Sequence, residues 1–293
     1  IDDIVLPDGS THMGCLGGGS VHAIMGMRVW SDQVGLVAKV GYDFPLALEN
    51  ELKKLFDLRG LKHIPYRTVR AWQLFEEDGT RNEVFRTAES ESPYFYPGIQ
   101  DCPSAYDTLQ GVHLHCRWDD VEEWVTFLRK RGDPFILWEP IQSDLLSENC
   151  DNFMRILPLI DCISPNLQEA QSLLGLEDPY DQLKEFIKHG APMAVIRAGA
   201  AGSIYADSKG RYIRVPAVKV PKVVDQTGAG NAYCGGLIVG CKLFEEPFGA
   251  LCRAAVSASF TLEQFGAFFE IEGIEKKAEE RYADCYAEIL RMN

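Results

Sequence analysis

Short apolar segments alternate with longer segments of helical periodicity along the chain after about residue 107. This alternation is typical of βαβ units, in which a parallel sheet is covered by helices. The second half of the chain therefore predicts an α/β domain. We expect strands at Gly111–Cys116, Pro134–Trp138, Ile160–Ile163 and Met193–Ile196, and helices at Asp120–Arg131, Leu167–Leu174 and Tyr180–His189.

The first third of the chain has a different pattern. Residues 14–19 are rich in glycine, and two strand-like segments, Thr68–Phe75 and Asn82–Thr87, flank the turn signal Asp78-Gly79. Asp-Gly between strand-like segments favours a β-hairpin. A hairpin with so few apolar residues needs a larger body to pack on, and we expect a lid over a substrate cleft.

One domain spanning residues 1–293, with lid elements from about 6–21 and 66–90, accounts for the whole pattern. Residues 1–5 predict the second half of a strand. Because the chain does not begin with Met, we expect native residues before Ile1.

Composition excludes several classes of protein. The formal net charge of −14 disfavours nucleic acid and anionic membrane as partners, because an acidic protein surface repels these negatively charged partners. No apolar run reaches the length of a membrane span. The nine cysteines are an odd number without a C-x-x-C pair, which argues against a disulfide framework and a zinc site. We expect a reducing compartment, the cytoplasm or the nucleus.

Residues 223–236 contain the strongest candidate for a functional site, and their pattern predicts strand, glycine turn and helix. Gly228 and Gly230 let the backbone approach a ligand closely. The first turn of the helix then offers N–H groups and a positive dipole end to an anion such as a phosphoryl group. A tight βα turn with helix-packing glycines is the structural alternative.

The string from Asp225 to Gly236 resembles the carboxy-terminal signature of the PfkB/ribokinase family of carbohydrate kinases, D-T-x-G-A-G-D-x-F-x-G-G. This resemblance implies a three-layer α/β/α fold, with a mainly parallel central sheet and a small β lid. It also implies phosphoryl transfer from ATP, with Mg²⁺, to the alcohol of a sugar, nucleoside or related metabolite. It assigns Gly228, Ala229 and Gly230 to catalysis and Asp225 and Thr227 to the cofactor site, and leaves open a nearby monovalent cation such as K⁺.

Two further segments occur in the family's order. Asn166 and Glu169 resemble its N-x-x-E element, which organises Mg²⁺ and phosphate, although the same spacing is typical of a helix capping box. Residues 195–203 resemble the strand and G-x-x-G turn along the nucleotide, with Arg197, Gly199 and Gly202 as candidate contacts. A plain hairpin turn is the alternative there.

The amino-terminal segment resembles the part of the family that borders the acceptor. Gly17 and Gly18 match the glycine pair, and Asp2 falls where a carboxylate grips substrate hydroxyls. His22 stands at the family's asparagine position, which leaves the acceptor's identity open. Arg70 completes the candidate acceptor site, and a homodimer through the lid is left open.

Two features that depart from the family's sequence pattern resemble a fungal branch of the family, typified by the maintenance-of-killer protein. They are the segment that begins at Arg70 and the pair Glu139-Pro140, which replaces the family's Asp-Pro-Asn. His113 and His115 alternate on one predicted strand and invite a metal hypothesis. No third ligand is spaced to join them, and we interpret them as hydrogen-bonded strand histidines.

Asn231 stands where the family has the aspartate that takes the proton from the attacking hydroxyl. An amide orients a hydroxyl but does not titrate near neutral pH, and loss of a general base costs about 10²–10⁴-fold in rate. An engineered substitution, a natural pseudokinase or a different base would each explain it. Two functions follow: a weakened sugar or nucleoside kinase, and a binding module that keeps the nucleotide cleft. A hydroxymethylpyrimidine-type kinase is a third alternative.

Overall fold

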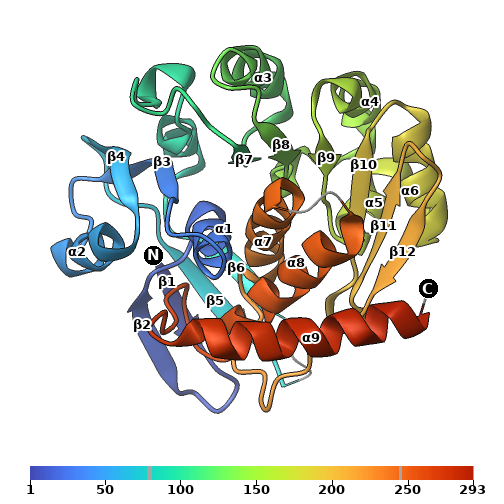
Figure 1. Ribbon diagram of the computed structural model, residues 1–293. Helices are drawn as coiled ribbons and strands as arrows, with labels where there is room; N and C mark the ends of the chain where they lie inside the picture. Colours follow the sequence, from blue (N-terminus) through green and yellow to red (C-terminus); the bar gives the residue numbers. More distant parts are fainter. Residues whose placement is uncertain (78–80, 244–245, 293) are drawn as a thin grey trace.

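The computed structural model describes residues 1–77, 81–243 and 246–292. A six-stranded sheet in the order β12-β11-β10-β9-β8-β7 forms the centre, beside a four-stranded sheet, β2-β1-β5-β6, and a pair, β3-β4. Figure 1 shows these sheets with helices around them. The central strands are β7 (Gly111–Leu114), β8 (Phe135–Trp138), β9 (Cys162–Ile163), β10 (Met193–Arg197), β11 (Ser203–Asp207) and β12 (Tyr212–Val215).

The central sheet is parallel from β7 to β10, and β11 and β12 add antiparallel strands at one edge. The α/β fold predicted from the alternating pattern is therefore confirmed. Side chains of β8 alternate between two cores, because successive residues of a strand point to opposite faces. Ile136 and Trp138 belong to one core and Leu137 to the other, and all three are fully buried.

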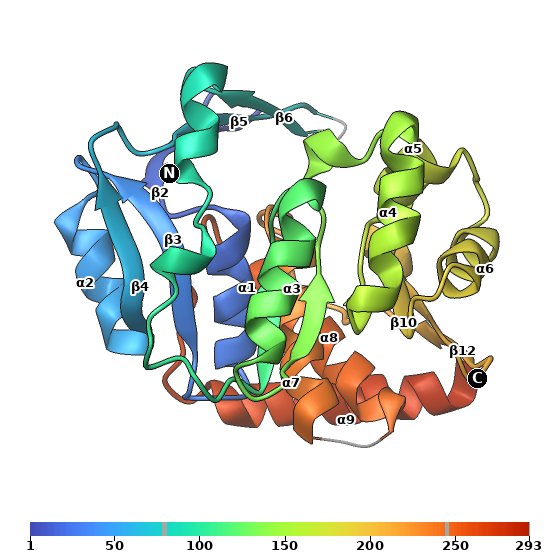
Figure 2. The same ribbon diagram turned by 90° about the horizontal axis from the view of Figure 1, so that it is seen from above.

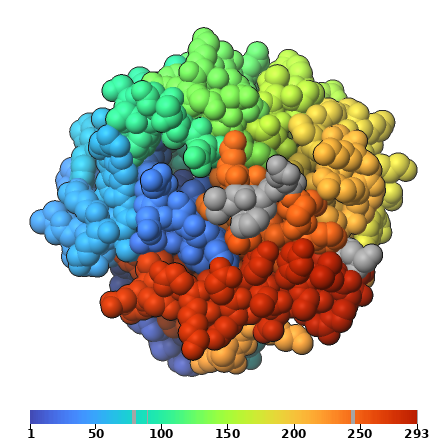
Figure 3. Space-filling view, in the orientation of Figure 1, coloured from blue at the N-terminus to red at the C-terminus, as the bar shows by residue number. Residues whose placement is uncertain are grey.

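Each core is completed by its own layer of helices. One face is covered by α3 (Val121–Arg129), α4 (Cys150–Ile156), α5 (Leu167–Leu174) and α6 (Pro179–Lys188). The other face is covered by α7 (Ala229–Leu243), α8 (Pro247–Thr261) and α9 (Ile274–Met292). The three layers are seen in Figures 1 and 2, and α9 forms a ridge across the face shown in Figure 3. Among the described helices, none combines the length and apolar character that a bilayer span requires.

A third core joins α1 (Gly19–Arg28) and α2 (Leu46–Leu55) to the parallel pair β3 (Gly35–Gly41) and β4 (Asp57–Ile64). The small sheet comprises β1 (Asp2–Val5), β2 (Thr11–Cys15), β5 (Ala71–Phe75) and β6 (Arg81–Phe85). β1 lies in its middle, antiparallel to β2 and parallel to β5, and β6 is antiparallel to β5.

The small sheet differs from the segments expected for a lid in two ways. It includes β1, and residues 19–21 belong to helix α1 instead. The turn expected at Asp78-Gly79 lies outside the described residues. The strand expected at residues 223–224 is wrong: the N–H of Val224 donates to the carbonyl of Leu262, just after α8, and this segment joins no sheet.

Helices α1 and α7 pack so closely that glycine is required at their contact. A Cβ at Gly26 would lie 2.1 Å from the carbonyl oxygen of Ala232, and one at Gly235 would lie 2.0 Å from that of Ala23. No real Cβ approaches an oxygen so closely, and larger side chains would separate the helices. This contact sets the distance between the amino-terminal ends of α1 and α7, where the candidate site lies.

We expect Gly235→Ala to lower the free energy of unfolding by about 1–2 kcal/mol. Overpacking typically costs about 1–3 kcal/mol, and the better helix propensity of alanine recovers no more than about 1 kcal/mol. Urea denaturation measures the difference, with Ala283→Ser on the exposed face of α9 as control. A rise in stability, as propensity alone predicts, would show that the helices separate freely.

Candidate functional site

A cleft of about 2700 Å³ opens between the carboxyl ends of β7 and β8, the amino-terminal ends of α1 and α7, and the small sheet. Most of the predicted site residues line it: Asp2, Gly17, Gly18, His22, Asn166, Glu169, Arg197, Gly199, Gly202, Thr227, Gly228, Ala229, Gly230 and Asn231. Asp225 and Arg70 do not. The long-range folding of the chain thus gathers segments that are more than 200 residues apart in the sequence.

The glycine turn before α7 is stabilised by a hydrogen bond to Asp225, and His22 and Arg197 pack closely against its glycines. The carboxylate of Asp225, which is 3% exposed, accepts a 2.8 Å hydrogen bond from the N–H of Thr227. Gly228 has a φ of +75°, and a Cβ there would lie 2.0 Å from the His22 ring. A Cβ at Gly230 would lie 1.9 Å from Arg197 Nη1. The glycines are therefore required by packing as well as by the approach of a ligand.

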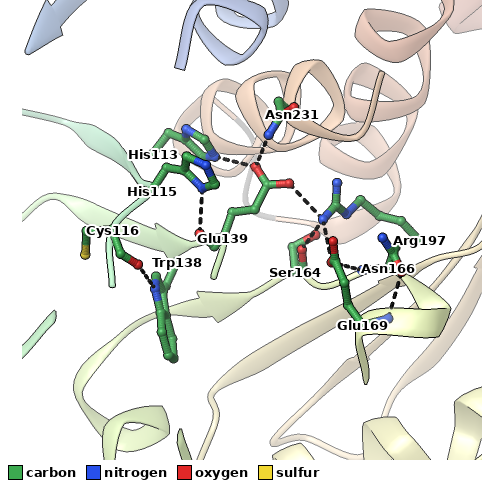
Figure 4. A network of polar contacts seen from close by, with 10 residues as sticks. All are labelled: His113, His115, Cys116, Trp138, Glu139, Ser164, Asn166, Glu169, Arg197 and Asn231. Carbon is green, nitrogen blue, oxygen red and sulfur yellow. Dashed lines mark hydrogen bonds and ion pairs between the residues drawn. The ribbon is translucent and has the colours of Figure 1, made fainter. Parts of the chain in front are cut away.

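Glu139, directly after β8, connects the groups around this turn (Figure 4). Its carboxylate is buried; Oε1 lies 2.7 Å from Arg197 Nη2. Oε2 accepts hydrogen bonds from His113 Nε2 at 2.7 Å and from Asn231 Nδ2 at 2.9 Å. Burial alone would raise the pKa of Glu139, but Arg197 and His113 hold it far below its usual range. Glu139 is therefore ionised at neutral pH.

Sequence reasoning noted Glu139 only as a departure from the family pattern and did not count it among the site residues. A signal was present, because the residue follows an apolar strand of a parallel sheet, and ligands bind at the carboxyl ends of such strands. Its three partners could not be read from the sequence.

Arg197 extends the network to a second carboxylate. Its Nη2 donates to the carbonyl of Ser164 at 2.8 Å and lies 3.5 Å from Glu169 Oε2. Burial raises the pKa of Glu169, and the Arg197 guanidinium opposes this shift. Asn166 and Glu169 form the capping box of α5, with hydrogen bonds of 2.9 and 2.7 Å. The capping interpretation is therefore confirmed, and both residues also line the cleft.

His113 has more potential ligands nearby than the sequence suggested. One ligand atom each from His113, Glu139 and Cys234 lies within 4.8 Å of the others, and His115 is not part of this group. Both histidines have hydrogen-bond partners, as predicted. Arg197 nevertheless supplies a positive charge to the same carboxylate, and burial raises the pKa of the Cys234 thiol, which keeps it protonated. These groups form a hydrogen-bonded network and are unsuited to a cation.

His22 is buried beside the glycine turn, with 1% of its surface exposed. Neither ring nitrogen has a hydrogen-bond partner among the described residues. Burial, with a smaller contribution from the charge of Arg81, lowers the pKa of His22 to about 4. The imidazole is therefore neutral at pH 7 and borders the cleft with unused polar atoms.

Side chains of the small sheet enter the same cleft. Asp2 is buried against Gly17, where a Cβ would lie 1.8 Å from Asp2 Oδ2, and burial raises the pKa of this carboxyl. Gln73 Nε2 donates to Asp2 Oδ1 at 3.3 Å and to Glu83 Oε1 at 2.7 Å. Sequence reasoning missed Gln73 and Glu83, although they lie on the two strand-like segments that it identified.

Two more arginines belong to the first third of the chain, and only Arg81 reaches the glycine turn, whereas Arg70 lies away from it. Arg81, which was also missed, donates from Nη1 to Thr227 Oγ1 at 3.2 Å and so reaches from β6 to the glycine turn. Arg70 lines a second hollow of about 470 Å³, with its Nη1 3.9 Å from Asp3 Oδ2. The structure therefore sets Arg70 apart from the other predicted acceptor residues.

Comparisons with known proteins bear on the family and the fold of the chain. Residues 107–272 match the profile of the pfkB family carbohydrate kinase. The chain is 25% identical to the cytidine kinase of Thermococcus kodakarensis, over 82% of this chain and 84% of that protein. It is 26% identical to Protein MAK32 of Saccharomyces cerevisiae, over 85% of this chain and 78% of that protein. The crystal structure of a putative ribokinase II from E. coli, in complex with ATP and Mg²⁺, superposes with a TM-score of 0.75 at 19% identity, covering 97% and 96% of the two chains.

We expect the buried neutral His22 to make the protein less stable in acid. Its pKa falls from 6.5 to about 4 on folding, so below pH 6.5 the unfolded chain binds a proton that the folded protein does not. Between pH 7 and 4 the free energy of unfolding should fall by about 3 kcal/mol more than in His22→Asn, which does not titrate. Urea denaturation across this pH range measures the free energy of unfolding of both proteins. The same pH dependence in both would contradict the lowered pKa of His22.

Proposed function

Because the chain belongs to the pfkB family of carbohydrate kinases, we propose that it transfers a phosphoryl group from ATP to the alcohol of a sugar, nucleoside or related small metabolite. The observation that carries this proposal is the meeting of the glycine turn of α7 with Asn166, Glu169 and Arg197 at one cleft. The nine free cysteines support a reducing compartment, the cytoplasm or nucleus.

The nucleotide phosphates are proposed to bind at residues 228–231. Backbone N–H groups at the start of α7 and its dipole favour anions there. The carboxylate and amide oxygens of Glu169 and Asn166 are hard ligands that suit Mg²⁺, which would neutralise charge on the phosphates. Arg197 and the turn from Gly199 to Gly202 would lie along the nucleotide. The ATP and Mg²⁺ in the E. coli structure support this arrangement.

The acceptor is proposed to bind between the small sheet and the glycine turn. Asp2, Gly17, Gly18 and His22 border that part of the cleft and offer a carboxylate and unused ring nitrogens to hydroxyl groups. The likeness to a cytidine kinase supports a nucleoside as one acceptor class.

Asn231 is proposed to orient the attacking hydroxyl without taking its proton. Its Nδ2 donates to the ionised Glu139, which fixes the amide so that Oδ1 is left as an acceptor. An amide oxygen accepts a hydrogen bond but is far too weak a base to be protonated. Proton transfer is therefore slower than with an aspartate at this position. The same residue favours a second candidate function, a pseudokinase that binds nucleotide and metabolite as a regulatory module.

The small sheet is proposed to act as a lid, because Arg81 already links β6 to Thr227 in the glycine turn. An arginine so placed closes the acceptor site and adds positive charge beside the transferring phosphoryl group.

We expect Arg81→Gln to lower kcat/KM by about 10–100-fold, since a charge-assisted contact contributes about 1.5–3 kcal/mol. Arg86→Gln is the matched control, because Arg86 pairs with Asp3 at 2.6 Å instead of reaching Thr227. Equal activity of both variants would contradict a closing contact at Arg81.

Asn231→Asp should raise kcat by as much as the 10²–10⁴-fold that a general base contributes, with little change in ATP affinity. Arg197 and His113 already compensate the charge of Glu139, so the added carboxylate stays free to turn to the cleft. ADP production is measured against pooled nucleosides and sugars, with calorimetry of Mg-ATP binding in K⁺ and Na⁺ buffers in parallel.

Each outcome of this experiment separates the hypotheses. Equal, near-zero turnover in both forms, with nucleotide bound, would favour the binding module. Absence of adenine-nucleotide binding at millimolar concentration would contradict the proposed nucleotide site. A higher affinity in K⁺ than in Na⁺ would place a monovalent cation near Asp225 and Thr227.

A further inference from the structure

His115 holds a basic nitrogen toward the cleft. It follows β7 directly, and its Nδ1 lies 2.9 Å from the backbone carbonyl oxygen of Glu139. Because a carbonyl oxygen only accepts, Nδ1 carries the hydrogen of the neutral imidazole. Nε2 is then left with its lone pair. Within the described part of the chain, Nε2 makes no hydrogen bond, and His115 lines the cleft.

The space in front of His115 Nε2 is the space in front of Asn231. Gly19, the first residue of α1, borders both: a Cβ there would lie 2.9 Å from Asn231 Nδ2 and 3.2 Å from His115 Nε2. A side chain at residue 19 would fill this position, and glycine leaves it open. Figure 4 shows His113 and Asn231 directed to the carboxylate of Glu139, with His115 beside His113 and linked to the backbone of Glu139. The side-chain amide of Asn231 and the Nε2 atom of His115 therefore border the same open position at the cleft.

Neighbouring groups are poorer proton acceptors than His115. Both oxygens of Glu139 are engaged by Arg197, His113 and Asn231, and these contacts favour its ionised form so strongly that it binds protons weakly. His113 Nε2 carries the hydrogen that it donates to Glu139. Among the residues that contact Glu139, His115 combines a free lone pair with a place at the cleft.

We propose that His115 Nε2 is the general base of this kinase in place of the missing aspartate, an inference that rests on the proposed phosphotransfer. The O–H bond of the acceptor breaks, and its proton passes to Nε2. The acceptor oxygen forms a bond to the γ-phosphorus of ATP, while the bond from that phosphorus to the β,γ-bridging oxygen breaks and its electron pair leaves with ADP. The imidazolium then releases its proton to solvent.

The charges around His115 favour the transfer of a proton to its ring. Burial lowers its pKa below 6.5, His113 on β7 and Arg197 on β10 add to the effect, and Glu139 after β8 opposes it. From α1 and α7 it faces the uncharged Gly19 and Asn231. The ring is thus neutral at pH 7, and the nearby Glu139 stabilises the positive charge that it gains in the transition state. Activity should fall in acid, at a pH below the usual titration range of histidine, where His115 becomes protonated.

The test compares four forms of the protein: the unchanged chain, His115→Asn, Asn231→Asp and the double variant. Asparagine at 115 keeps a donor near the position of Nδ1 for the Glu139 carbonyl and removes Nε2. His63→Gln is the control, because His63 is an exposed histidine beside Glu49 that does not line the cleft. Each form is assayed with saturating Mg-ATP and a pool of ribonucleosides, ribose and fructose, and Mg-ADP affinity is measured by calorimetry.

We expect His115→Asn to lower kcat by about 10²-fold or more, with unchanged Mg-ADP affinity, while His63→Gln has no effect. Asn231→Asp should be at least as active as the unchanged chain and should lose little when His115→Asn is added, because the carboxylate replaces the imidazole. The loss of kcat in acid should have a different pH midpoint in the double variant, because a carboxylate replaces the imidazole as the titrating base.

Equal kcat for the unchanged chain and His115→Asn, with Asn231→Asp faster, would overturn the assignment of His115 and leave the kinase function standing. Absence of turnover in all four forms, with nucleotide still bound, would overturn both. If His115→Asn does not fold, His115→Gln is assayed in its place, and a kcat equal to that of the unchanged chain excludes His115 as the base.

Discussion

The candidate site depends on the buried ion pair between Glu139 and Arg197. Removing two charges from water is costly, and such a pair is stable only when both partners have further hydrogen bonds. Here Glu139 also accepts from His113 and Asn231, and Arg197 also donates to the carbonyl of Ser164. The pair therefore ties the ends of β8, β9 and β10 to the start of α7. Loss of either partner would leave an uncompensated charge in the centre of the site.

Asn231 and Glu139 form a matched pair within this network. The amide of Asn231 donates to the carboxylate, which an ionised aspartate cannot do. An aspartate would place a second negative charge beside Glu139, whereas asparagine adds a hydrogen bond. The amide at 231 and the carboxylate at 139 are therefore matched physically. Asn231 is thereby part of the hydrogen-bonded support for the cleft.

Much of the fold and part of the site followed from local sequence patterns. The helix at Leu167–Leu174 was predicted with the bounds that the structure shows, because its capping box and periodicity are both local. The turn at Gly228 and Gly230 was found because glycine is required where other groups approach the backbone. The expected strand at residues 223–224 was wrong, because an extended segment becomes a strand only when another strand pairs with it, and Val224 bonds instead to Leu262.

The sequence by itself determined the alternation of strands and helices, the glycine turn, and the residue types around the cleft. Tertiary structure alone decided which of those residues meet. Glu139 finds partners 26 and 92 residues away, and Arg81 reaches a threonine 146 residues away. Periodicity reports the environment of each segment separately, whereas these contacts depend on sheet order, strand register and the close packing of α1 on α7. His115 illustrates the difference: one carbonyl, brought to it by the pairing of β7 with β8, fixes which of its nitrogens faces the cleft.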